Sequence, residues 1–163
     1  MNSASDTHQD LVNDPDDFQY DVMVIIGLFG SGKSREAKGL SQLGHSLFDE
    51  YCQHTPEKHL GRPDLSPRRD DLIRSIFAGN KCVITDVQFC DARFLDSLEL
   101  DIVRNCPNFA IKRIYYKNDS EQCKANLKAL PNPPQHRLKA IDDYTHIYRP
   151  PEDAKPVYRP TSR

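Results

Sequence analysis

The chain has 163 residues, which corresponds to one domain with room for terminal extensions. Its 22 Lys and Arg residues against 24 Asp and Glu residues give a net charge of −2, which argues against nucleic-acid binding driven by a broad basic surface. Charged residues interrupt every hydrophobic run before it reaches the roughly 18 apolar residues that span a bilayer, and the start MNSASDTHQD has no secretory-signal pattern.

The first residues, 1–19, contain Asp6, Asp10, Asp14, Asp16 and Asp17 and little that could be buried. A segment of this composition cannot offset its ordering entropy, so we expect a disordered acidic arm.

Strands alternate with helical patterns over residues 20–148. Short, largely apolar runs predict strands at 20–27, 45–48, 81–86 and 109–116. Apolar periodicity predicts helices at 33–44, at 72–77, at 94–102 after an N-cap at Asp91, at 121–130 after a capping box from Asn118 to Glu121, and at 138–148. Prolines and a glycine in 51–67 predict a loop or a broken helix. The alternation predicts an α/β fold with a mainly parallel sheet covered on both faces.

The last residues, 149–163, contain four prolines and are expected to be extended or irregular. We expect this tail to lie outside the core, although Val157 and Tyr158 offer side chains that can dock on the body.

The cysteines of the chain show no CxxC spacing; they are Cys52, Cys82, Cys90, Cys106 and Cys123. Neither a disulfide framework nor a zinc site is indicated, and a reduced, cytoplasmic protein is expected.

One segment carries a specific chemical motif. Residues 27–34, GLFGSGKS, match G-x-x-x-x-G-K-[ST] between a predicted strand and a predicted helix. Glycines there allow backbone N–H groups to close around phosphate oxygens, and the start of the following helix also faces the anion. The predicted nucleotide-binding residues are Gly27, Gly30, Ser31, Gly32, Lys33, Ser34 and Arg35.

Two of these residues have expected roles toward the phosphates and a metal. Lys33 supplies an ammonium for the β- and γ-phosphates, and the Ser34 hydroxyl is a ligand for Mg²⁺. Asp86 ends the apolar strand VITD on the same rim, where it can hold the ion through water. Alternatively, Asp86 only caps the turn after the strand. Val87 follows it instead of a glutamate, which favours transfer over hydrolysis, and no N-K-x-D motif indicates a GTPase.

Further charged residues are candidates for the acceptor side of the site. Asp49 follows the second predicted strand and is expected to orient an acceptor hydroxyl, with Glu50 as the alternative. Arg62 and Arg68 are candidate substrate ligands, and Arg137 opens the last helix, where a lid could carry it onto the transferring phosphoryl group. The alternative for each arginine is an ordinary solvated side chain.

Together with GLFGSGKS, the segments LFDE at 47–50 and VITD at 83–86, and a basic residue before the final helix, make the chain resemble the P-loop kinases. Over about residues 20–148 it is similar to small nucleoside, nucleotide and metabolite kinases and to the kinase domain of polynucleotide kinases. The resemblance implies a P-loop NTPase-type three-layer αβα sandwich. It also implies that Lys33 and Ser34 bind ATP and Mg²⁺, that Asp49 faces the acceptor and that Arg137 belongs to a lid.

The function expected from motif and resemblance is transfer of phosphate from ATP, with Mg²⁺, to a small hydroxyl- or phosphate-bearing acceptor of nucleotide-like type. Two alternatives stay open: phosphorylation of the 5′-hydroxyl of a nucleic-acid terminus, and a nucleotide-dependent binding module with little turnover. No membrane partner is expected, and the sequence indicates no oligomeric state.

Overall fold

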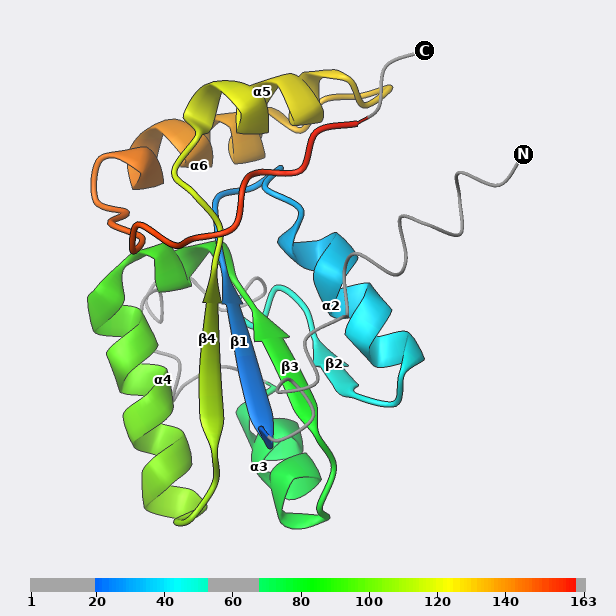
Figure 1. Ribbon diagram of the computed structural model, residues 1–163, viewed down its shortest axis with the longest axis vertical. Helices are drawn as coiled ribbons and strands as arrows, with labels where there is room; N and C mark the ends of the chain where they lie inside the picture. Colours follow the sequence, from blue (N-terminus) through cyan, green and yellow to red (C-terminus); the bar gives the residue numbers. More distant parts are fainter. Residues whose placement is uncertain (1–19, 53–67, 161–163) are drawn as a thin grey trace.

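The computed structural model describes residues 20–52 and 68–160. Within them lies a four-stranded, all-parallel sheet with the order β2-β3-β1-β4 (Figure 1). The strands are β1 (Val22–Ile26), β2 (Ser46–Phe48), β3 (Cys82–Thr85) and β4 (Ile111–Tyr115). The helices are α2 (Lys33–Gln42), α3 (Arg69–Phe77), the short 3₁₀ helix η4 (Val87–Cys90), α4 (Ala92–Asn105), α5 (Ser120–Lys128) and α6 (Gln135–Thr145). The predicted α/β fold with a parallel sheet is confirmed.

Helices cover both faces of the sheet because the side chains of β1 alternate between two apolar clusters. Val22, Val24 and Ile26 belong to a cluster that includes residues of α3 and α4. Met23 and Ile25 point the other way, into a cluster with residues of α2. All five residues are fully buried, which is why this central strand is one continuous apolar run.

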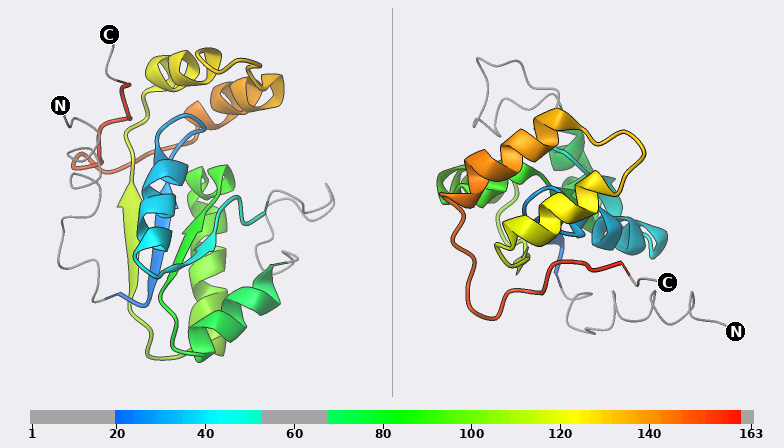
Figure 2. Two further views of the ribbon diagram at one scale, coloured as in Figure 1. Left: turned by 90° about the vertical axis from the view of Figure 1, so that its right-hand side faces the viewer. Right: turned by 90° about the horizontal axis from the view of Figure 1, so that it is seen from above.

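Helices α5 and α6 stand together above the carboxyl ends of the strands (Figures 1 and 2). The Asn118 side chain joins them, because its amide donates to the carbonyl oxygens of Thr145 (2.9 Å) and Tyr148 (3.1 Å). The capping-box prediction at Asn118 is therefore wrong by one residue: Asp119 is the N-cap and accepts from the Gln122 N–H at 3.2 Å. The last helix ends at Thr145, and Tyr148 lies buried beyond it.

The Pro-rich C-terminal segment packs against the body over its described part. The expectation that it lies outside the core is wrong there, and the expectation that Val157 and Tyr158 can dock on the body is confirmed. Ala154 and Val157 are buried. Lys155 forms a parallel bridge with Tyr116 just beyond β4, and its N–H donates to the Tyr115 carbonyl at 2.8 Å. These contacts extend the sheet by one backbone bridge next to β4.

Some predictions fall on residues that the structure does not describe. They are the acidic arm at 1–19, most of the loop predicted at 51–67, and Arg62 within it. In the described ranges, no helix has both the length and the apolar character needed to cross a membrane.

Candidate functional site

The glycine-rich loop joins β1 to α2 at the carboxyl edge of the sheet. Gly30 and Gly32 have φ values of +82° and +108°, in the left-handed region that favours glycine. Gly32 is the N-cap of α2 and has no side chain to cap it, so the first N–H groups of the helix are available to a ligand. A Cβ on Gly30 would lie 2.5 Å from the Cys123 carbonyl oxygen, which shows how closely α5 packs on the loop.

The loop opens onto a cavity of about 270 Å³. Its walls come from the loop, the start of α2, α5, α6 and the C-terminal segment; they include Gly30, Gly32, Lys33, Ser34, Arg35, Asn126, Arg137 and Tyr158. The predicted phosphate-binding residues from Gly30 onward are thus gathered at one open cavity, except for Ser31, which is fully buried.

Lys33 is the buried cation of this cavity, with only 4% of its surface exposed. Its Nζ lies 4.8 Å from the centre of the Phe29 ring. Burial lowers the pKa of Lys33, and the negative charges of Asp86, Asp49 and Glu50 oppose that shift. Because little water reaches Lys33, its ammonium interacts strongly with an anion placed beside it, and the neighbouring carboxylates offset part of that attraction.

Three oxygen-bearing side chains meet beside Lys33. One carboxylate oxygen of Asp49 accepts from the Ser34 hydroxyl at 3.0 Å and also from the Thr85 hydroxyl. The elements that bring them together are α2, the end of β2 and the end of β3. Asp49 and Ser34 were both predicted for this rim, whereas Thr85 was not.

Asp86 is 3% exposed and uses both carboxylate oxygens on backbone groups. One accepts from the Gln88 N–H at 2.9 Å and the other from the Cys52 N–H at 2.6 Å. Burial raises the pKa of Asp86, and these two hydrogen bonds partly offset that rise. Asp86 therefore does cap the turn after β3, and whether it also has a role toward a metal stays a prediction. In the described ranges, no three His, Cys, Asp or Glu side chains form a group suited to a metal ion.

Arg137 extends from α6 over the loop. Its guanidinium pairs with the Glu50 carboxylate at 2.5 Å and lies 5.0 Å from the centre of the Phe29 ring. Glu50 adopts a positive φ of +53°, which is uncommon for a non-glycine residue. The predicted lid arginine thus lines the same cavity as Lys33, and its part in catalysis stays a prediction.

Arg68 contacts the protein backbone. Its guanidinium donates to the carbonyl oxygens of Asp49 (2.8 Å) and Leu47 (3.1 Å) and lies 5.0 Å from the Phe48 ring. This geometry favours a role in holding the end of β2, and through it Asp49, over the predicted role as a substrate ligand.

Sequence reasoning missed Phe29 and Asn126. It expected Tyr158 to be able to dock on the body but did not place it at this cavity. The Asn126 amide donates to the carbonyl oxygens of Gly30 (2.8 Å) and Tyr158 (2.7 Å) and so ties the loop, α5 and the C-terminal segment together. No sequence pattern marks an asparagine on a helix for such a task. Phe29 occupies an unspecified position of the motif, and Tyr158 lies in a segment without periodicity.

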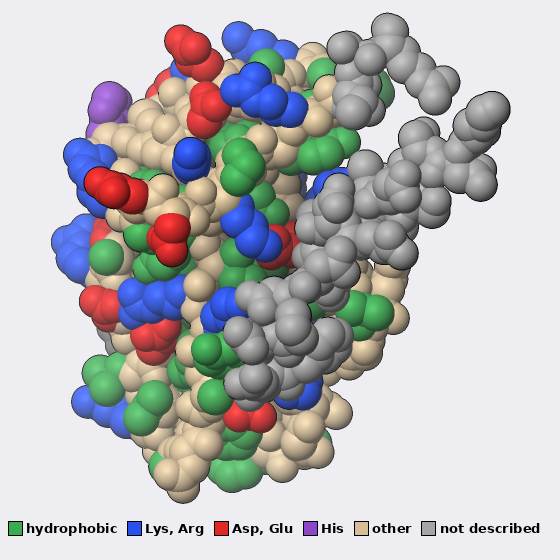
Figure 3. Space-filling view, viewed as in Figure 1, with side chains coloured by type: hydrophobic (Ala, Val, Ile, Leu, Met, Phe, Trp, Pro, Cys, Tyr) green, Lys and Arg blue, Asp and Glu red, His purple; other side chains and the backbone are tan. Residues whose placement is uncertain are grey.

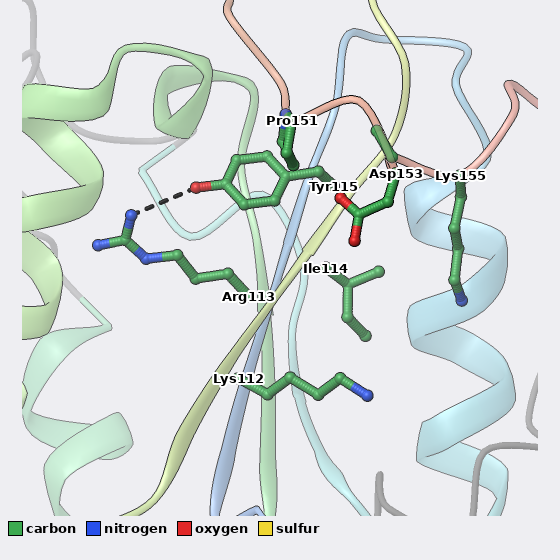
Figure 4. A pocket seen from close by; sticks show the side chains of 8 residues that line it. Lys112, Arg113, Ile114, Tyr115, Pro151, Asp153 and Lys155 are labelled. Carbon is green, nitrogen blue, oxygen red and sulfur yellow. Dashed lines mark hydrogen bonds between the residues drawn. The ribbon is translucent and has the colours of Figure 1, made fainter.

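A separate cavity of about 190 Å³ lies outside β4, next to the C-terminal segment (Figure 4). Arg113 donates to the Tyr115 hydroxyl at 3.2 Å there, and it is also held by Glu99 at 2.6 Å. On this face of the molecule, basic and acidic side chains are interspersed (Figure 3). We do not assign this cavity to the site, because Arg113 is committed to ion pairs and because the cavity shares no lining residue with the one at the glycine-rich loop.

Comparison with known proteins adds no relative: no protein-family model matches the chain, and no curated protein matches it. The functional interpretation therefore rests on the motif and on the geometry around it.

Proposed function

We propose that this protein is an ATP- and Mg²⁺-dependent phosphotransferase of the P-loop type, acting on a small acceptor that carries a hydroxyl or phosphate group. The observation that carries the proposal is the GLFGSGKS loop. It follows a fully buried parallel strand, begins a helix and opens onto a cavity beside the buried Lys33.

The loop and Lys33 are proposed to bind the triphosphate. Backbone N–H groups at the start of α2 and the Lys33 ammonium would attract phosphate oxygens. Because Lys33 is almost excluded from water, its interaction with the charge of the transferring group is only weakly screened.

The oxygen ligands beside Lys33 fit Mg²⁺. This ion prefers hard oxygen ligands and is commonly held by one or two carboxylates together with substrate phosphates, and the Ser34 hydroxyl and the Asp49 carboxylate lie 3.0 Å apart. When bound, Mg²⁺ would neutralise negative charge on the β- and γ-phosphates. The Thr85 hydroxyl donates to the same Asp49 oxygen and orients it.

Glu50 is a better candidate than Asp49 for the residue that takes the proton of the acceptor hydroxyl. A cavity of about 160 Å³ next to the phosphate loop is lined by Phe29, Glu50, Asp86, Val87 and Gln88, and Asp49 is not part of its wall. In the proposed reaction the acceptor oxygen attacks the γ-phosphorus, the bond from that phosphorus to ADP breaks, and the acceptor proton passes to Glu50. Arg137, released from Glu50, would then stabilise charge on the transferring group.

The test is transfer of label from γ-labelled ATP to a panel of nucleosides, nucleotides, sugars and 5′-hydroxyl oligonucleotides. We expect acceptor-dependent transfer that falls about 100-fold or more in Lys33→Met and persists in Lys38→Met, which removes an exposed lysine from the same helix. Glu50→Gln should lower the turnover rate more than it weakens ATP binding. Absence of transfer to every acceptor would refute the kinase proposal, and nucleotide binding without transfer would favour the binding module.

A further inference from the structure

A cavity of about 360 Å³ lies between the start of α2, the end of β4 and the C-terminal segment. Its lining residues are Gly32, Arg35, Glu36, Tyr116, Lys155, Pro156 and Tyr158. Gly32, Arg35 and Tyr158 also line the cavity at the phosphate loop. A ligand with its phosphates on the loop can therefore extend the rest of its structure into this second cavity.

Tyr158 offers a flat surface at the junction of the two cavities. The Arg35 guanidinium, itself a planar group, lies over its ring with Cζ 4.5 Å from the ring centre. The Tyr158 N–H donates to the Ser31 carbonyl at 2.9 Å, and its carbonyl accepts from Asn126 at 2.7 Å. Because both backbone groups are tied down, the ring is held next to the phosphate loop, where a second flat group can stack on it.

Glu36 provides an unmet hydrogen-bond acceptor in the wall of this cavity. The residue is 1% exposed. One carboxylate oxygen accepts from the Tyr116 hydroxyl at 3.0 Å and from Lys155 Nζ at 2.6 Å. The other oxygen is buried and has no hydrogen-bond partner in the described part of the chain. A buried acceptor left without a donor is costly, so a ligand that brings an N–H group to it is favoured.

Lys155 supplies a hydrogen-bond donor, its ammonium group, beside the Glu36 acceptor. Its side chain is 45% exposed, while that of Glu36 is 2% exposed, so the ammonium can turn toward a ligand while the carboxylate stays in place. The wall therefore presents an acceptor beside a donor. The edge of an adenine presents the reverse, an amino group beside a ring nitrogen acceptor.

We propose that this cavity is the subsite for the base of the donor nucleotide and that it selects adenine. The ring stacks on Tyr158, the amino group donates to the free oxygen of Glu36, and a ring nitrogen accepts from Lys155. The inference rests on the proposed function, because it takes the triphosphate to be bound at the loop. Inosine triphosphate is the informative contrast, since an oxygen replaces the amino group and would face the carboxylate.

The test is calorimetry on the full chain with Mg²⁺ and three ligands: ATP, inosine triphosphate and inorganic tripolyphosphate. We expect ATP to bind about tenfold more tightly than either of the others, given the usual contribution of base stacking. Tyr158→Ala should remove most of this advantage. Because Tyr158 also lines the cavity at the glycine-rich loop, tripolyphosphate binding is the internal reference and should fall less than ATP binding. Tyr158→Phe should lose less of the ATP advantage. Phe77→Ala, which deletes an exposed aromatic ring on α3, is the matched control and should change neither affinity.

Glu36→Gln tests the amino-group contact. The amide can donate as well as accept, so the preference for ATP over inosine triphosphate should fall toward one. The ratio is measured within one variant and does not depend on how much of it folds. Equal binding of ATP and tripolyphosphate by the wild type, or an unchanged ratio in Glu36→Gln, would overturn this inference and leave the phosphate site standing. Failure of all three ligands to bind would overturn the proposed function itself.

Discussion

The substitution Asp86→Asn separates a structural role of this residue from a role in metal binding. The carboxylate holds two backbone N–H groups, of Gln88 at 2.9 Å and of Cys52 at 2.6 Å. The first caps η4, and the second fastens the segment after β2 to the end of β3. An asparagine keeps one oxygen acceptor and turns an NH₂ group toward the other N–H, so one of these bonds is lost.

The size of the effect follows from the charge and the burial. A hydrogen bond to a charged group contributes about 1.5–3 kcal/mol, and an N–H facing an NH₂ group loses all of it. Removing the charge itself gives back part of this loss, because burial raises the pKa of Asp86 and disfavours its ionised form. We therefore expect the free energy of unfolding to fall by about 2 kcal/mol.

Urea unfolding monitored by circular dichroism measures this loss, with an unchanged slope as the sign that only stability has moved. Asp91→Asn is the comparison. Asp91 caps α4 by accepting one backbone N–H, that of Arg93, at 3.0 Å, and its carboxylate also pairs with the exposed Arg93 guanidinium at 2.7 Å. An exposed ion pair adds little to the cap, so we expect a loss of about 1 kcal/mol. An Asp86→Asn protein at least as stable as Asp91→Asn would refute the reasoning. If that stable variant also lost the Mg²⁺ dependence of ATP binding, the result would support a role of Asp86 in holding Mg²⁺.

The remaining predictions concern Arg137, the glycine-rich loop and the buried thiols of Cys90 and Cys123. Arg137→Ala should lower the rate of transfer about a thousandfold while costing at most about 1 kcal/mol of stability, since its ion pair is partly exposed; steady-state kinetics and urea unfolding check both. Gly30→Ala would put a Cβ 2.5 Å from the Cys123 carbonyl oxygen. It should weaken triphosphate binding in calorimetry and destabilise the fold by about 2 kcal/mol. Gly79→Ala is the control: Gly79 has a similar φ and open space around it, so the substitution should lower stability less and leave binding unchanged. Burial raises the pKa of Cys90 and of Cys123 from 9.0 to about 12, so the stability they contribute is fully present below pH 9.0 and is lost as the pH rises toward 12. Thermal unfolding between pH 8 and 11 should show this fall, and rapid alkylation of the native thiols at pH 8 would contradict it.

The centre of the sheet was predictable because β1 and β3 are buried on both faces. Such strands appear in the sequence as unbroken apolar runs, as in VMVII of β1 and CVIT of β3. For the C-terminal segment, the sequence indicated Val157 and Tyr158 as side chains that can dock. The path of the segment was not predictable, because it depends on backbone hydrogen bonds, which leave no periodic pattern.

The positions of the candidate site residues were predictable where the motif fixes their spacing, as for Lys33 and Ser34. The position of Asp49 was predictable because it follows a parallel strand, which brings it to the rim. Asp86 shows the limit, because a carboxylate at the end of a strand is equally suited to a cap and to a metal. The bridging role of Asn126 depends on tertiary contacts with two distant segments, so no local pattern announces it.

The pairing of Glu36 with Lys155 joins positions 119 residues apart. During synthesis, which proceeds at roughly 5–20 residues per second, the wall that Lys155, Pro156 and Tyr158 build cannot exist until those residues have left the ribosome. A nascent chain therefore carries its glycine-rich loop for several seconds before the adjoining cavity has all its sides. If the proposed nucleotide needs both parts to bind, it binds only after Tyr158 has been added to the chain and has emerged.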